Sequence, residues 1–191
     1  MNIKQNKVVR WGAEALVVGG LLLGTLTSAG AASAAGLERY GGPTGRTTAP
    51  VTGSYRQTPV APLDAAEVAA LTEAINEEYG ALNTYQAVLS QFGSVTPFSR
   101  IVRAEQQHVN ALARLFTKYD LSVPTNPGLV PAPTFASLTA ACQTGVDAEI
   151  ADAKLYDTLK PSVDNADVLQ VFANLQAASL YRHLPAFNAC N

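Results

Sequence analysis

Ionisable residues stand in this 191-residue chain where the apolar faces of its predicted helices would normally carry leucine. From Val68 to Phe92, apolar residues recur at alternating steps of three and four, the period of an amphipathic helix, and Glu78 lies within that stripe. A second stripe from Phe98 to Tyr119 contains Glu105 and His108, an E-x-x-H pair on consecutive turns. Because helices bury such stripes against one another, the pattern predicts a helical bundle with charged groups in its core.

A third helical segment adds Glu149 to this set of charged residues. An isolated buried carboxylate is strongly unfavourable unless it is paired or bound to a metal, so carboxylates and a histidine at one level of a bundle predict a metal site. The alternative is a buried hydrogen-bonded pair of Glu105 and His108, with an arginine of the same segment nearby. Glu77 lies off the apolar stripe and is expected in solvent.

The first 34 residues have the features of a secretory signal peptide. Basic residues precede an apolar run over residues 15–26, and Ala32-Ser33-Ala34 forms an A-x-A cleavage pattern. An uncleaved membrane anchor is the alternative, but the dense Gly, Ser and Ala after the apolar run favour cleavage. The sequence therefore predicts a secreted or extracytoplasmic protein with no membrane span after cleavage.

Composition divides the remaining chain into a linker and one domain. Residues 35–62 are rich in Gly, Pro and Thr and predict a flexible linker, whereas residues 63–191 are enough for a single domain with a core. Losing the signal removes three basic residues and one acidic residue, which changes the net charge from -2 to -4. That charge argues against nucleic acid or an anionic membrane as the main partner.

Capping residues and prolines predict the ends of four helices. The first begins after Asp64 and ends at Gly93, and the second begins with Thr96 as N-cap and Pro97 as the first helical residue. The third begins near Ser137 and stops before Pro161. The fourth is predicted to start at Asp164 or Asn165 and to run to about Leu184, ending before Pro185 because proline interrupts a helix.

The connections between these helices predict the topology. Short links join helices one and two and helices three and four, which makes two antiparallel hairpins. The segment over residues 120–136 contains four prolines. It can span up to about 56 Å when extended, and a 25-residue helix is about 37 Å long. We therefore predict an all-α four-helix bundle whose hairpins are joined by a long crossover.

The two predicted hairpins also resemble each other in sequence. Glu78 and Tyr85 have the same spacing as Glu149 and Tyr156. Residues 104–112 align with residues 179–187, which places His183 opposite His108. A pseudo-twofold axis would then gather carboxylates and one histidine from each half, a donor set that suits two ions of iron or manganese. The paired tyrosines either fill the core or support the ligands. His183 could instead be a core or capping histidine.

The second half departs from the first at Leu180. This residue lies three before His183, where the first half has Glu105, and leucine cannot bind a metal. Asp152, one turn after Glu149, could supply the missing carboxylate, and Gln176 is a poorer candidate. If neither substitutes, the second ion would be weakly held.

Two cysteines remain, Cys142 and Cys190. An exported protein matures in an oxidising compartment, so we expect them to form a disulfide that fastens the C-terminal tail to the third helix. Thiolate ligation of a metal is the alternative, but the chain has no C-x-x-C motif.

At these residues the chain resembles the ferritin-like superfamily, the carboxylate-bridged di-iron bundles. Ala104–His108, Gly145–Glu149 and the segment from Ala178 to Phe187 are similar to the prokaryotic ferritin-like family catalogued as domain of unknown function 2202. The resemblance covers residues 64–190. It implies a centre of two iron ions and the oxidation of Fe(II) by oxygen or peroxide. The competing hypothesis is a non-enzymatic cell-envelope module with a degenerate metal site.

Overall fold

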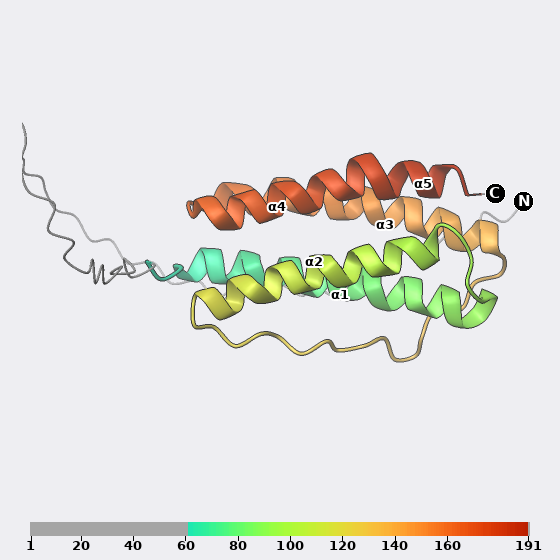
Figure 1. Cartoon of the computed structure of the whole chain (residues 1–191), viewed down its shortest axis with the longest axis horizontal. Helices are drawn as coiled ribbons and strands as arrows, with labels where there is room; N and C mark the ends of the chain where they lie inside the picture. Colours follow the sequence, from blue (N-terminus) through green and yellow to red (C-terminus); the bar gives the residue numbers. More distant parts are fainter. Residues whose placement is uncertain (1–60, 191) are drawn as a thin grey trace, which may run out of the picture. The chain divides into compact units, whose positions relative to one another are not determined.

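A computed structural model describes residues 61–190, and these residues form an all-α bundle without a β-strand (Figure 1). The predicted signal peptide and nearly all of the predicted linker lie outside the described residues. The helical elements are α1 (Ala65–Phe92), α2 (Phe98–Lys118), α3 (Leu138–Leu159), the 3-10 turn η1 (Lys160–Ser162), α4 (Ala166–Ala178), the π segment η2 (Ser179–His183) and α5 (Leu184–Asn188).

Side-chain caps begin α1 and α3 at the predicted residues. Asp64 accepts hydrogen bonds from the backbone of Ala66 and Glu67, and the Glu67 carboxylate accepts one from the Asp64 backbone, which completes a capping box. Glu67 also accepts from the backbone N–H groups of Asp164 and Asn165, so it ties the start of α1 to the start of α4. The second helix begins one residue later than predicted, with Pro97 as its N-cap residue.

The topology confirms the prediction of two antiparallel hairpins joined by a long crossover. In Figure 1, α1 lies beside α2, and α3 lies beside the helix formed by α4, η2 and α5. The crossover follows α1 along the bundle. Tyr79 donates a hydrogen bond to the Pro124 carbonyl at 3.0 Å, and the Gln91 amide group exchanges two hydrogen bonds with the backbone of Phe135.

The fourth helix does not end before Pro185 as predicted. It continues to Asn188, because a π segment precedes the proline and a new α-helical turn begins at Leu184. The Leu184 N–H donates to the Ser179 carbonyl, five residues earlier. Pro185 then falls in the first turn of α5, where a missing N–H costs little. The predicted end was wrong because a π turn can carry a helix past a proline.

The apolar core has two parts, and on α2, α3 and the fourth helix the buried charged residues lie between them. One part includes Leu71, Leu112 and Phe172, and the other includes Tyr85 and Phe187. In the second part α3 and α5 approach closely. A Cβ atom added at Gly145 would lie 2.6 Å from the buried Phe187 ring, so this position requires glycine.

Candidate metal centre

Four helices bring the five main predicted ligands together in the core. Glu78 comes from α1, Glu105 and His108 from α2, Glu149 from α3, and His183 from the last position of η2. All five are buried, with His108 the most exposed at 9%. The burial predicted from the apolar stripes is therefore confirmed for Glu78, Glu105, His108 and Glu149, and charged groups do occupy the core.

The five side chains form two sets that share one carboxylate. Glu78, Glu105 and His108 make up the first set, and Glu105, Glu149 and His183 make up the second. The donor atoms within each set lie within 4.8 Å of one another. Glu105 is common to both sets, so one residue of α2 connects the two halves of the bundle.

Both histidines approach the carboxylates through Nδ1. His108 Nδ1 lies 2.9 Å from Glu105 Oε2 and 3.1 Å from Glu78 Oε2. His183 Nδ1 lies 3.0 Å from the other oxygen of Glu105 and 3.4 Å from Glu149 Oε2. The two imidazole rings are stacked, with centroids 5.3 Å apart. Glu105 thus presents one oxygen to each histidine.

The paired tyrosines contact the carboxylates in a crossed arrangement. Tyr85 of α1 donates a hydrogen bond to Glu149 Oε1 of α3, and Tyr156 of α3 donates one to Glu78 Oε1 of α1, both at 2.7 Å. Burial and the neighbouring carboxylates hold the pKa of each tyrosine well above its usual value, so both remain donors. Each phenol therefore orients one carboxylate of the opposite half and leaves its second oxygen facing a histidine.

The protein's own charges keep the histidines protonated at neutral pH. Burial lowers the pKa of both imidazoles, but the surrounding carboxylates outweigh burial and raise the pKa of His108 to about 10 and of His183 to about 9. Burial raises the pKa of Glu78 to about 8. Burial also opposes ionisation of Glu105, but the two histidines beside it lower its pKa to about 2. A metal ion bound here would displace the imidazole protons.

The spacing of the donor atoms is suited to a metal ion. Donor atoms about 2.1 Å from one ion lie roughly 3 Å from one another, which matches the spacings of 2.9–3.4 Å between Nδ1 and carboxylate oxygens. His183 Nδ1 is buried and makes no hydrogen bond within the described residues. Carboxylates with one imidazole per set are the donors that iron and manganese accept. These residues could hold one ion in each set.

Asp152 lies beside the two sets and belongs to neither. It is buried, and Ser179 donates a 2.6 Å hydrogen bond to its Oδ2, whereas Oδ1 has no partner within the described residues. Burial, together with the charge of Glu78, raises its pKa well above the usual value. Gln176 contacts the Ala153 carbonyl and Asp157 instead of the ligands.

The π segment changes which residue of the fourth helix faces the core. A π turn contains one residue more than an α turn, so the residue one turn before His183 is Ser179 instead of Leu180. Ser179 is buried, and Leu180 is only partly so. The expectation that Leu180 occupies the position of the missing carboxylate is therefore wrong. Ser179 occupies it and points its hydroxyl at Asp152.

Glu77 was also placed incorrectly from the sequence. Its side chain is partly buried instead of solvated, and burial together with the charges of Glu149, Glu73 and Glu105 raises its pKa to about 7. The apolar stripe could not reveal this because α3 packs beside α1 and brings Glu149 close. The adjacent pair Glu77-Glu78 is the only trace of this feature in the sequence.

The alternative partners considered from the sequence do not contact the cluster. Arg103 and Arg114 are exposed, and neither forms an ion pair with Glu105 among residues 61–190. The sulfur atoms of Cys142 and Cys190 lie at disulfide distance, with Cα atoms 5.9 Å apart, and neither cysteine belongs to a ligand set. Among the described residues, no helix is long and apolar enough to cross a membrane.

Comparison with known proteins supports the fold and gives no function. No protein-family model and no curated protein matches the chain. A solved structure that is similar is that of the hypothetical protein MJ0754 from Methanococcus jannaschii DSM 2661. The two share 23% sequence identity with a TM-score of 0.61 over 68% of this chain and 82% of that one. At this identity the similarity shows the helical fold alone.

Proposed function

We propose that this chain is an exported ferritin-like protein that binds a dinuclear iron centre, with manganese as the second choice of metal, and oxidises Fe(II) with oxygen or peroxide. The observation that supports the proposal is the pair of buried ligand sets that share Glu105. A carboxylate between two histidines from different halves of the bundle is what a bridging ligand requires.

The protein residues would hold, orient and charge-balance the centre. A bound pair of Fe(II) ions would supply two electrons to oxygen or peroxide. Glu78, Glu105 and Glu149 would compensate the positive charge of the ions, and the histidines would bind as neutral imidazoles after losing their protons. Tyr85 and Tyr156 would orient the outer carboxylates through their hydrogen bonds.

One observation favours the competing hypothesis of a non-enzymatic helical module with a degenerate site. The second half has Ser179 where a symmetric centre would have a second bridging carboxylate, and Asp152 bonds to Ser179 beside the sets. A centre with fewer carboxylates binds divalent ions more weakly.

Elemental analysis of the purified exported protein separates the two hypotheses. The dinuclear proposal expects about two ions of iron or manganese per chain, as in the di-iron bundles, and the degenerate site expects well below one. Aerobic oxidation of added Fe(II), followed optically, should then be faster with this protein than with a Glu105→Gln variant. Equal rates in the two proteins would refute the proposed oxidation.

A further inference from the structure

One oxygen of Asp152 in α3 is buried and has no partner in the part of the chain that the structure describes. The residue is 7% exposed. Ser179 donates a hydrogen bond to Oδ2, whereas Oδ1 has no partner among these residues. No lysine, arginine or histidine of residues 61–190 forms an ion pair with this carboxylate. A buried carboxylate oxygen in this environment is unfavourable unless a cation or a proton joins it.

The strongest charges around Asp152 are those of other carboxylates. Burial, and then the charges of Glu78, Glu149 and Glu77, raise its pKa well above its usual value. Asp152 follows Glu149 by three residues, so both side chains project from the same face of α3. Tyr156, four residues further along, donates a hydrogen bond to Glu78 of α1, which shows that this stretch of α3 packs against α1. The unpaired oxygen therefore lies in a negative potential.

Glu77 connects this negative region to the surface. Its side chain is partly buried, and it forms no ion pair with a basic residue of the described chain. Burial and the charges of Glu149, Glu73 and Glu105 raise its pKa to about 7. Glu73 is exposed and lies one turn earlier on the same face of α1. Carboxylates therefore extend from the exposed Glu73 through the partly buried Glu77 to the buried Asp152.

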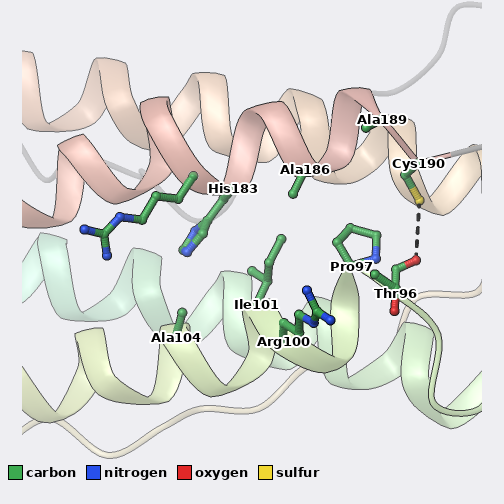
Figure 2. A pocket seen from close by; sticks show the side chains of 10 residues that line it. Thr96, Pro97, Arg100, Ile101, Ala104, His183, Ala186, Ala189 and Cys190 are labelled. Carbon is green, nitrogen blue, oxygen red and sulfur yellow. Dashed lines mark hydrogen bonds between the residues drawn. The ribbon is translucent and has the colours of Figure 1, made fainter.

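The opposite side of the bundle is less suited to a cation. A groove of about 610 Å³ lies there between α2 and the end of the fourth helix, and His183 points from the fourth helix toward α2 (Figure 2). The lining of the groove includes Arg100 and Arg182 and, among the described residues, no carboxylate. Positive side chains lower the local concentration of cations, whereas a row of carboxylates raises it. A cation is therefore favoured on the side formed by α1 and α3.

We propose that Asp152 and Glu77 bind one divalent cation at a site outside the two ligand sets that contain histidine. Two carboxylates with water as the remaining ligands suit Mn(II) and similar hard cations. The cation would give Asp152 Oδ1 the partner that the described residues do not supply. Neither residue belongs to a ligand set, so this outer site is a separate one.

The outer site should bind its cation weakly and exchange it readily. It has no imidazole ligand, and carboxylate sites that keep water bind with dissociation constants on the order of 0.1–1 mM. Dialysis would remove such an ion. Since Asp152 lies one turn from Glu149, the outer site would supply cations to the ligand sets. Only this consequence rests on the proposed function.

Electron paramagnetic resonance of Mn(II) measures the outer site by itself. Mn(II) is titrated into full-length Glu105→Gln protein, in which both ligand sets lack their shared carboxylate, and the signal of free Mn(II) is followed. We expect saturable binding of about one Mn(II) per chain. Adding Asp152→Asn should weaken that binding by about tenfold or more, because a carboxylate ligand is lost. Asparagine keeps an oxygen that can accept the Ser179 hydrogen bond, so circular dichroism should be unchanged.

Asp147→Asn in the same protein is the matched control. Asp147 is exposed on α3 and accepts a hydrogen bond from Gln143, so removing its charge should leave the Mn(II) affinity unchanged. Glu77→Gln should weaken Mn(II) binding as Asp152→Asn does. Absence of saturable Mn(II) binding to Glu105→Gln protein would overturn the proposal and is the result expected if a proton alone satisfies Asp152. Equal affinity with and without Asp152→Asn would also overturn it.

Measurements on protein with intact ligand sets separate the outer site from the dinuclear proposal. Two tightly bound ions in that protein, without Mn(II) binding to the Glu105→Gln protein, would leave the dinuclear proposal standing and refute the outer site. The reverse result would support the outer site and refute the dinuclear centre. When both are present, Asp152→Asn should slow the loading of the ligand sets severalfold without changing their final content. An unchanged rate would refute supply through the outer site.

Discussion

In the first hairpin, Glu105 and His108 are three residues apart on a regular α-helix, whereas in the second hairpin Ser179 and His183 are four residues apart through a π segment. Both steps point two side chains at the same level of the core. The first step delivers a carboxylate and an imidazole. The second places a hydroxyl and an imidazole there, so the second half contributes one candidate ligand fewer.

The structure compensates for this difference by using Glu105 twice. Its two oxygens lie 2.9 and 3.0 Å from the two histidines, which come from different hairpins. In a symmetric centre, each half would bring its own bridging carboxylate. In the proposed centre, the second half would therefore depend on the first for a ligand.

The largest effect is expected for Glu105→Gln. An amide cannot supply the negative charge that both ligand sets share, so bound metal should fall from about two ions per chain to near zero. Elemental analysis after dialysis against Mn(II) measures this change. Glu73→Gln, which replaces an exposed glutamate of α1, is the control and should keep its metal. Retention of one ion in Glu105→Gln would show that the sets are independent.

The two histidines should each account for one ion. His108→Ala removes a ligand of the first set only, and His183→Ala removes a ligand of the second set only. Each variant should retain about one ion, with the bundle still folded, because the shared carboxylate keeps one set complete. If His183→Ala left the metal content unchanged, the second set would not be a metal site, and the degenerate-site hypothesis would be favoured.

The stability of the metal-free bundle should fall as the pH rises. The pKa of His108 is raised from 6.5 to about 10, and that of His183 to about 9. Their protons therefore stabilise the fold below about pH 6.5, and this contribution is lost as the pH rises through the folded pKa values. The pKa of Glu78 is also raised, from 4.5 to about 8, so the stability that its proton contributes is likewise lost as the pH rises.

Metal binding should reverse that trend, because the ligands bind after losing protons. Thermal melting of EDTA-treated protein should occur at a lower temperature at pH 9 than at pH 6, and the increase caused by Mn(II) should be larger at pH 9. Glu105→Gln protein with Mn(II) is the control and should show no such increase. An equal increase at both pH values would contradict proton displacement from the histidines.

Removal of the disulfide should lower the stability of the domain without changing the candidate metal ligands. Replacing Cys142 and Cys190 by Ser should lower the free energy of unfolding by about 2–4 kcal/mol, because the closed loop restrains the unfolded chain. Denaturant titration measures this loss, and elemental analysis should show unchanged metal content. Mass spectrometry of the purified protein with and without reduction should detect the bridge itself. Free thiols in that material would contradict it.

The smallest effect is expected for Leu180→Glu. Because the π segment turns Leu180 away from the position of the missing ligand, a carboxylate there should leave metal content and Fe(II) oxidation unchanged. Ser179→Ala is the companion variant. It removes the hydroxyl that bonds Asp152 and should destabilise the fold by about 1–3 kcal/mol, which thermal melting can detect. Increased metal content in Leu180→Glu would show that the helix is regular there.

Much of the bundle follows from the sequence by local physical chemistry. Apolar steps of three and four define which face of α1 and α2 is buried, and the prolines and capping residues mark where the helices begin and end. These rules identified the buried positions of Glu78, Glu105 and His108 as well as the crossover. They succeed because each depends on the geometry of one helix and on the chain length between helices.

Only the tertiary structure decided how the halves share their residues. The double contact of Glu105 and the crossed bonds of Tyr85 and Tyr156 arise between helices, and the period of one helix does not specify its neighbour's register. The π segment was also decided by the tertiary structure. Buried residues Leu175, Ser179, His183 and Phe187 recur at steps of four, which in a regular α-helix would rotate the last of them about 120° away from the first. Burial against α3 outweighs the local preference for α-helix there, so the position facing the core became Ser179 instead of Leu180.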